Sequence, residues 1–295
     1  MKQDIAPIIT PREPLVLRRA GATLEIDPAL GGSLRAFRIK QTEILRPLPQ
    51  RSDDITVTAS FPLIPIVNRI PDGKFEFEGR QIDLEGNFMG LPDFIHGHGW
   101  RSAWSMVSQT DTRAVFEFQH FPGRWPWHYR GQQTVVLRQD GFRHTLRVRN
   151  LSDTNMPAAL GFHPYFPTTE NTILSFDFAG HWVNNEWGHA IRREPGPGRK
   201  DFAAGADLID TVMTDATHYG WGGQARLSEP GRPDTLITAS ANCPNLHVFF
   251  PPNGNFVAIE PTSGRSNPFN VGPVEYETLA PGESFEIWMD VAVRD

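Results

Sequence analysis

Apolar and polar residues alternate along most of this chain, in segments of about five to eight residues separated by Gly, Pro, Asn or Asp. This period of two is typical of β-strands with one buried face. Helical periodicity is almost absent, and 26 Gly and 26 Pro leave little room for a long helix. The pattern predicts strands over residues 22–26, 33–39, 113–118, 133–138, 144–149, 172–178, 246–250 and 285–293.

The last of these segments shows the alternation clearly. One face carries Phe285, Ile287, Met289, Val291 and Val293, and the other carries Glu286, Trp288 and Asp290. We expect the first face to be buried. Turn residues predict hairpin-like turns at 139–141 and 71–73, and the polar stretch 192–200 is expected to be a surface loop.

No change of composition marks a linker, and 39% hydrophobic residues are enough for a substantial core. The sequence therefore predicts an all-β protein, a large antiparallel β-sandwich that forms a single domain over residues 1–295. The single cysteine, Cys243, excludes an internal disulfide and any metal site built from several cysteines. We expect it to be an inert, packed side chain.

The net charge of −6 is not offset by any basic block, which argues against a nucleic-acid partner. No apolar run reaches the roughly 18 residues needed to cross a bilayer, so no membrane partner is expected. Residues 1–7 contain an acid and a proline where a secretory signal would need an apolar core. A cytoplasmic protein is therefore expected.

Two ionisable side chains interrupt apolar runs that lie far apart in the chain. His163 stands in the segment Gly-Phe-His-Pro-Tyr-Phe (161–166), and Glu260 stands in Phe-Val-Ala-Ile-Glu-Pro (256–261). A charged group in a run built for burial needs a reason, and an acid and a base on opposite sides of a small molecule would supply one. The first proline places His163 at a strand end or a bulge, and the second is expected to end the strand that carries Glu260.

Each of the two residues also has an ordinary structural explanation. His163 could be a histidine at the edge of the core, hydrogen-bonded to a backbone carbonyl. Glu260 could be a carboxylate at the rim, paired with an arginine such as Arg265.

Further candidates surround other turns. His96 and His98 alternate with glycines, which favours close approach of a ligand over a metal site, although His98 could equally be a framework residue beside Trp100 and Trp104. Asn68 and Arg69 end an apolar run, so Arg69 could bind hydroxyls or form a structural salt bridge. Asp210 could cap a turn or accept from a hydroxyl. Aromatic rings can stack on the C–H faces of sugars, and the candidates are Trp100, Trp125, Trp127 and Trp221.

In this order and spacing, the segments resemble the aldose 1-epimerase (galactose mutarotase) family, from about Thr23 to the C-terminus. The resemblance rests on residues 68–70 with 72–75, on the turn 96–97, on 161–166, and on 260–261 followed by 267–270. It implies a β-supersandwich, a monosaccharide substrate, and a mechanism with neither metal nor cofactor. We expect a monomer or homodimer.

The resemblance also implies the roles of single residues. His163 matches the general acid that protonates the ring oxygen of a pyranose, and Glu260 matches the base that takes the proton of the anomeric hydroxyl. His96 and Arg69 match residues that hold hydroxyls and the ring-oxygen region, and Asp210 matches a hydroxyl-binding acid. Asn68 and His98 are neighbouring candidates. The family's Asp-His-Asn-Phe stretch reads Asp-Thr-Val-Met at 210–213 in this chain.

An ionised Glu260 is expected to keep His163 protonated and to raise its pKa. The leading hypothesis is a mutarotase that interconverts the α and β anomers of a hexose. One alternative is a mutarotase for an anionic hexose, a 6-phosphate or a 6-sulfonate such as sulfoquinovose, with Arg35, Arg38 or Lys74 as candidate basic groups. A second alternative is a carbohydrate-binding β-sandwich without catalytic activity.

Overall fold

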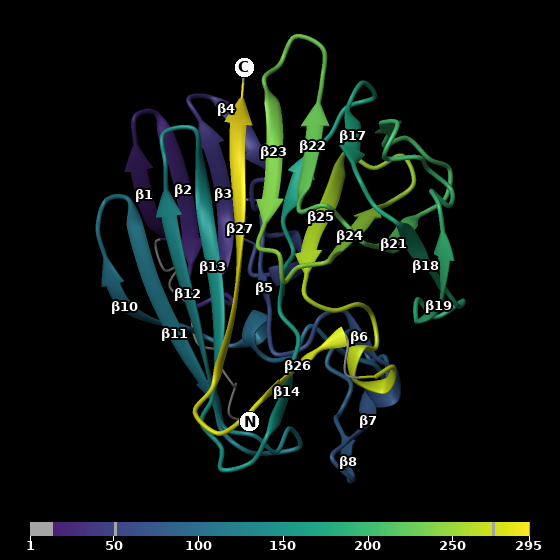
Figure 1. Ribbon diagram of the computed structural model, residues 1–295. Coiled ribbons are helices and arrows are strands. Elements are labelled where there is room, and N and C mark those ends of the chain that lie inside the picture. The colour runs from purple at the N-terminus through teal and green to yellow at the C-terminus, as the bar shows by residue number, and fades with distance from the viewer. Residues whose placement is uncertain (1–13, 50–51, 273–274, 295) are drawn as a thin grey trace, which may run out of the picture.

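Antiparallel β-sheets make up nearly all the regular structure of residues 14–49, 52–272 and 275–294, which the computed structural model describes. Residues 1–7, on which the expectation of no secretory signal rested, lie outside this part of the chain. Figure 1 shows two large sheets side by side, with a smaller N-terminal sheet behind the first. This confirms the all-β sandwich class.

The largest sheet has nine strands and runs across the left and centre of Figure 1. Its order is β10 (Ser105–Gln109), β11 (Arg113–His120), β12 (Tyr129–Leu137), β13 (Gly141–Asn150), β27 (Ser284–Arg294), β23 (Asp234–Ala239), β22 (Gln224–Ser228), β17 (Ile173–Phe176) and β20 (Ala206–Asp207). In β27, side chains alternate between buried and more exposed from Phe285 to Val291, as the sequence predicts.

The second large sheet has eight strands and carries the residues discussed below. Its order is β19 (Ala190–Pro195), β18 (Gly180–Asn184), β21 (Thr214–Tyr219), β24 (Asn245–Phe250), β25 (Phe256–Thr262), β15 (Gly161–Phe162) and β5 (Pro62–Leu63), and β16 (Tyr165–Pro167) also pairs with β25. All of these pairings are antiparallel.

A four-stranded N-terminal sheet contains β1 (Leu15–Arg19), β2 (Ala22–Asp27), β3 (Ser33–Ile39) and β4 (Thr42–Leu45). Three strand pairs lie at the lower end in Figure 1: β14 (Met156–Ala158) with β26 (Glu277–Leu279), β6 (Arg69–Ile70) with β9 (Phe94–Ile95), and β7 (Lys74–Phe77) with β8 (Arg80–Asp83).

The helical segments with described bounds are short 3-10 turns: η1 (Ile55–Val57), η2 (Pro71–Gly73), η3 (Gly99–Arg101) and η4 (Pro268–Asn270). Within the described residues, no helix is long and apolar enough to span a bilayer.

Two expectations about turns are wrong. Residues 71–73 form η2, which joins β6 to β7; because β6 pairs with β9 and β7 with β8, this turn is not a hairpin. The polar stretch 192–200 begins inside β19, whose residues up to Pro195 pair with β18, so only its second half is a loop.

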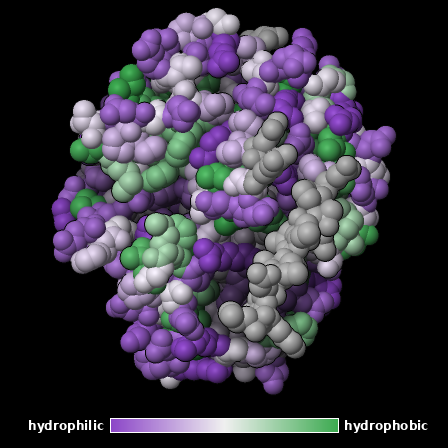
Figure 2. Space-filling model, turned by 180° about the vertical axis from the view of Figure 1, so that it is seen from behind, coloured by the Kyte–Doolittle hydropathy of each residue, from purple (hydrophilic) through white to green (hydrophobic). Residues whose placement is uncertain are grey.

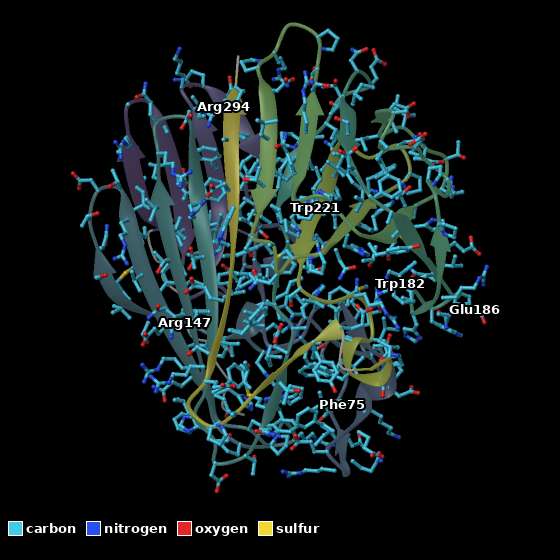
Figure 3. All side chains as sticks on the ribbon, in the orientation of Figure 1. Phe75, Arg147, Trp182, Glu186, Trp221 and Arg294 are labelled. Atoms are coloured by element: carbon cyan, nitrogen blue, oxygen red, sulfur yellow. The ribbon has the colours of Figure 1, made fainter. Side chains whose placement is uncertain are left out.

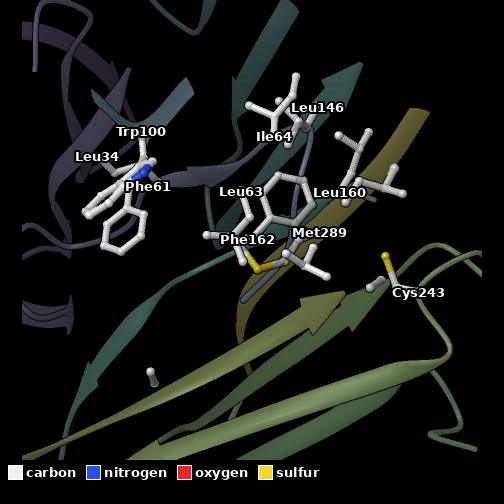
Figure 4. Packing of buried hydrophobic residues seen from close by; sticks show 14 of the residues in the cluster. Leu34, Phe61, Leu63, Ile64, Trp100, Leu146, Leu160, Phe162, Cys243 and Met289 are labelled. Carbon is white, nitrogen blue, oxygen red and sulfur yellow. The ribbon is translucent and has the colours of Figure 1, made fainter. Parts of the chain in front are cut away.

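Apolar side chains from all three larger sheets join in one core, while the face in Figure 2 is mostly hydrophilic with apolar residues scattered over it. Side chains fill the space between the ribbons in Figure 3. Figure 4 shows Leu63 and Phe162 of the eight-stranded sheet together with Leu146 and Met289 of the nine-stranded sheet. Cys243 is also buried, and burial raises the pKa of its thiol to about 12, as expected for an inert side chain.

Candidate active site

A break between β15 and β16 brings two distant parts of the chain together. His163 and Pro164 form this break, and β25 pairs with both flanking strands. The antiparallel register on either side of the break places His163 opposite Glu260 on β25. Facing positions of neighbouring strands hold side chains within contact distance. Nε2 of His163 lies 3.2 Å from Oε1 of Glu260, and both side chains are buried.

Pro261 does not end β25, which continues to Thr262. The register places Pro261 opposite Phe162 of β15, and the N–H groups of Ile259 and Ser263 on either side of it donate to carbonyls across the sheet, so the pairing of β25 continues past the proline. The alternative in which Glu260 pairs with Arg265 is also wrong. The guanidinium of Arg265 donates to the carbonyls of Ala190 and Ser266 instead.

His163 and Glu260 line a cavity of about 390 Å³, which lies in the size range of small-molecule sites. Its polar lining consists mainly of Arg46, Asn68, Arg69, His96, His163, Asp215, His247 and Glu260. Its aromatic lining consists of Phe61, Phe88, Trp100, Tyr165, Phe249 and Phe256. Polar groups therefore converge within largely aromatic walls.

The imidazole of His163 is held between aromatic rings. The centroids of Phe61 and Tyr165 lie 4.5 and 4.6 Å from that of His163, and the ring of His96 stands edge-on at 5.4 Å. The backbone N–H of His163 donates to the carbonyl of Phe61 at 3.1 Å. These contacts fix the ring and exclude water from around it.

His96 reaches the cavity through an unusual backbone conformation. Its φ is 59° and that of Gly97 is 72°, and Asn68, whose carbonyl accepts from the N–H of His96, has a φ of 50°. Positive φ is uncommon for residues other than glycine and is concentrated at functional sites. Nδ1 of His96 is buried and has no partner within the described residues.

The guanidinium of Arg69 also faces the cavity and forms no ion pair within 4.0 Å among the described residues, unlike the structural salt bridge considered above. Its neighbour is the β18–β19 loop, where a Cβ added to Gly188 would lie 3.4 Å from Nε. The donors of Arg69 are thus available to a ligand.

Three acidic or basic residues of the cavity escape the sequence reasoning, which are Arg46, Asp215 and His247. Asp215 on β21 and His247 on β24 form an ion pair, with Nε2 of His247 2.9 Å from Oδ1 of Asp215. The sequence predicts β24 as a strand, but only the pairing of β21 with β24 and of β24 with β25 reveals which polar residues lie beside Glu260.

Two predicted site residues lie elsewhere. Asp210 is outside the cavity lining, and its carboxylate pairs with Arg199 at 2.7 Å. Asp215, five residues later, supplies the acid that the sequence reasoning assigned to Asp210. His98 is also outside, where Nδ1 lies 3.1 Å from the hydroxyl of Tyr129 and the ring stacks on His120. His98 is therefore a framework residue.

The aromatic and basic candidates divide in the same way. Trp100 lines the cavity, whereas Trp125, Trp127 and Trp221 are buried outside its lining. Of these three, Figure 3 labels Trp221. Arg35 and Arg38 pair with acids of the N-terminal sheet, and Lys74 is exposed on β7. The basic residue that does line the cavity, besides Arg69, is Arg46.

Burial controls the electrostatics of the central pair. It raises the pKa of Glu260 to about 8 and lowers the pKa of His163 well below 6.5, with further lowering of the latter by the nearby His96 and His247. The expectation that Glu260 raises the pKa of His163 is therefore wrong. Desolvation outweighs the attraction, so the neutral forms of both groups are favoured.

His247 behaves in the opposite way. Burial by itself lowers its pKa, but the carboxyls of Glu260 and Asp215 outweigh burial and raise it above 6.5. For Asp215, burial favours a higher pKa, and the hydrogen bond from His247 reverses this and lowers it. Both shifts favour the charged forms of the two groups.

The arrangement can exchange protons with a small molecule. A donor and an acceptor 3.2 Å apart can remove a proton from one oxygen and deliver a proton to another oxygen on the same carbon. Among the described residues, no group of three or more His, Cys, Asp or Glu could hold a metal ion.

Comparisons with known proteins agree with this geometry. The family model described as aldose 1-epimerase matches residues 15–292. The uncharacterized protein YphB of Escherichia coli K12 is 30% identical over 274 residues, which cover 90% of this chain and 93% of that protein.

Solved structures show the same fold. A protein of Escherichia coli K12 superposes with a TM-score of 0.89 at 27% identity, covering 95% of this chain and 98% of that one. A galactose mutarotase-like protein of Clostridium acetobutylicum superposes with a TM-score of 0.81 at 18% identity, covering 95% and 94%.

Proposed function

The chain belongs to the aldose 1-epimerase family of isomerases, which interconvert the α and β anomers of aldoses, and we propose that it acts on a hexose by acid/base ring opening at His163 and Glu260. The observation that carries the proposal is the 3.2 Å contact between these two side chains at the wall of one cavity. The cytoplasmic location and the monomeric or homodimeric state stay predictions.

The reaction needs one acid and one base. The base takes the proton of the anomeric hydroxyl while the acid protonates the ring oxygen, so the bond between C1 and the ring oxygen breaks and an aldehyde forms. Rotation about the C1–C2 bond turns the other face of the aldehyde toward the ring oxygen. Re-addition then closes the ring, and both protons return to their original groups. The two sugar oxygens that exchange protons share one carbon in the ring form, which suits a donor and an acceptor in direct contact.

The pair carries a single proton at neutral pH. Burial favours the neutral form of both groups, which places that proton on Glu260. Its transfer across the hydrogen bond to His163 creates the carboxylate base and the imidazolium acid, and it leaves the charge of the pair unchanged. Catalysis by this pair requires that the proton be present, so exchange should slow as the pH rises through about 8.

The other polar residues of the cavity are suited to hold the sugar. Arg69 offers donors for hydroxyls or the ring oxygen, Asp215 offers an acceptor, and Asn68 and His96 offer both kinds of group. The rings of Trp100 and other aromatic residues provide flat apolar walls for the C–H faces of a pyranose. Holding the sugar in a reactive orientation adds to the rate acceleration that the acid and the base provide.

The test is the rate of anomer exchange, measured by exchange NMR on glucose, galactose, glucose 6-phosphate and sulfoquinovose. The wild-type protein should accelerate exchange of at least one of these sugars. His163→Ala and Glu260→Gln should each lower the rate by about 10²–10⁴-fold, because each removes one of the two proton-transfer groups. Circular dichroism should show that both variants keep the β-sheet signal.

A second His–Glu pair offers the matched control. Nε2 of His181 lies 3.8 Å from Oε2 of Glu194, outside the cavity. His181→Ala and Glu194→Gln should leave exchange unchanged. Full exchange activity in either His163→Ala or Glu260→Gln would refute the assigned roles, and buffer-level exchange of every sugar with the wild-type protein would refute the proposed activity on a hexose.

Arg46 favours a second candidate, a mutarotase for an anionic hexose. Its guanidinium lines the cavity and has no acidic partner within 4.0 Å among the described residues. Burial lowers the pKa of this guanidinium, which means that its charge is incompletely compensated. A 6-phosphate or a 6-sulfonate would supply the missing anion.

A further inference from the structure

Four side chains form a row across the eight-stranded sheet. The strand registers pair Thr217 of β21 with His247 of β24, and His247 with Glu260 of β25, and they place His163 opposite Glu260 at the break beyond. Residues at facing positions of antiparallel strands project from the same face, so the row ends at the proton-transfer pair. His247 is the ionisable member of the row that stands next to this pair.

Both ring nitrogens of His247 have a fixed partner. Nε2 lies 2.9 Å from Oδ1 of Asp215, and Nδ1 lies 2.9 Å from the hydroxyl oxygen of Thr217. A doubly protonated ring can donate to both oxygens at once, whereas a neutral ring has only one N–H to give. The side chain is 6% exposed, so its orientation is set by these contacts and not by solvent.

Charged and titratable groups approach His247 from several elements. The carboxylate of Asp215 stabilises its positive charge, as does Glu260 in its ionised form, and Arg69 from β6 opposes it. A charge on His247 acts in turn on His96 and His163 in the cavity and on His218 of β21. The acidic groups outweigh burial and the arginine, so the pKa of His247 is raised above its usual value.

We propose that His247 is a positioning residue, a cation held by Asp215 and Thr217 at the position beside Glu260 on the sheet, whose charge favours transfer of the proton from Glu260 to His163. The inference rests on the proposed function, since it assigns a residue to the same proton transfer. A cation beside a carboxyl favours the carboxylate, so His247 limits how tightly Glu260 holds its proton. It thereby eases the transfer of that proton to His163.

The experiment is the pH dependence of kcat/KM for anomer exchange in the wild-type protein and in His247→Gln. In the wild-type protein the activity should fall as the pH rises through about 8, where Glu260 loses its proton. Glutamine keeps a hydrogen-bonding amide but carries no charge, so the carboxyl holds its proton more tightly. The upper limb of the profile should therefore move to higher pH by about one unit, and kcat should decrease.

His181→Gln is the matched control, because it removes a histidine from the same sheet outside the cavity and should leave the limb in place. If kcat/KM of His247→Gln declined at the same high pH as that of the wild-type protein, whatever the loss of rate, the proposal would be overturned and His247 would be a structural residue only.

A second measurement does not depend on activity. The ring nitrogens of His247, followed by ¹⁵N NMR in the wild-type protein, should show the doubly protonated form at pH 7. A neutral tautomer would overturn the proposal even if the variant failed to fold. If the wild-type protein exchanged no sugar while His247 was cationic, the proposed function would fail and the charge assignment would stand.

Discussion

At the scale of single residues, Arg46 separates the two candidate substrate classes. Its guanidinium lies 3.8 Å from the ring centroid of Tyr165 and 4.5 Å from that of Phe256, and it donates to backbone carbonyls near η1. Arg46→Met keeps a long side chain on the same rings but removes the charge. For an anionic hexose, kcat/KM should fall by about 10–100-fold, the equivalent of a lost charged hydrogen bond, while exchange of a neutral hexose should change little.

Exchange NMR on glucose and glucose 6-phosphate, or on sulfoquinovose, measures this difference. Lys74→Met is the control, because it removes a positive charge at an exposed position outside the cavity. Equal losses for neutral and anionic sugars in Arg46→Met would argue against an anion site and for a general role in shaping the cavity.

The residues of the site differ in how far the sequence reveals them. His163 and Glu260 were predicted because each is an ionisable group inside a short apolar run, and the structure brings them together. Asp215 and His247 could not be found in this way, because Asp215 lies in a mostly polar strand and His247 lies in a segment that the sequence predicts only as a strand. Only the registers of β21, β24 and β25 place these residues beside Glu260.

The reversed electrostatics of the pair could not be predicted either. Reference pKa values favour an ionised Glu260 and a protonated His163. Both side chains are at least nine-tenths buried, and the cost of desolvating a charge exceeds the attraction between them. The degree of burial is a property of the fold, which the local sequence does not contain.

At the scale of elements, the turn that carries His96 depends on Gly97. The φ of Gly97 is 72°, and a Cβ at this position would lie 2.1 Å from the carbonyl oxygen of Ile64. Gly97→Ala should therefore destabilise the protein by at least ~2 kcal/mol, through backbone strain and a clash with rigid backbone. Thermal unfolding followed by circular dichroism measures the effect, and anomer exchange should slow because the turn positions His96.

Gly79 in the β7–β8 hairpin is the matched control. Its φ is 77°, but an added Cβ would meet nothing within 4 Å. Gly79→Ala should reveal the cost of the positive φ alone, about 1 kcal/mol, with normal exchange. Equal melting temperatures for the two variants would show that the backbone around Ile64 relaxes and that the clash does not matter.

The long strands were predictable, because each of the eight predicted ranges overlaps an observed strand. Alternation over five or more residues carries enough signal, and turn residues set the approximate ends. Two-residue strands such as β5, β6, β9 and β15 carry no such signal, although they deliver much of the site. Proline misled the prediction at Pro261, because the residue lies inside β25 and the backbone pairing continues on both sides of it.

At the scale of the whole molecule, the N-terminal sheet supports the site directly. Leu34 of β3 exchanges backbone hydrogen bonds with the segment just before Phe61, and the N–H of Arg46 donates to the carbonyl of Tyr165 at 2.8 Å. The apolar residues of this sheet also belong to the same core as those of the two large sheets. We infer that the chain unfolds as one cooperative unit, while the single domain expected from the sequence stays a prediction.

Leu24→Ala tests this coupling, because Leu24 on β2 is fully buried and is not one of the residues that line the cavity. The substitution should destabilise the protein by about 2–5 kcal/mol. If the sheets unfold together, calorimetry should show one transition at a lower temperature, and anomer exchange should be lost at that same temperature. Val107 on β10 is 56% exposed, so Val107→Ala should change neither the temperature of the calorimetric transition nor the temperature at which anomer exchange is lost. A separate early transition that leaves exchange intact would mean that the N-terminal sheet unfolds independently of the site.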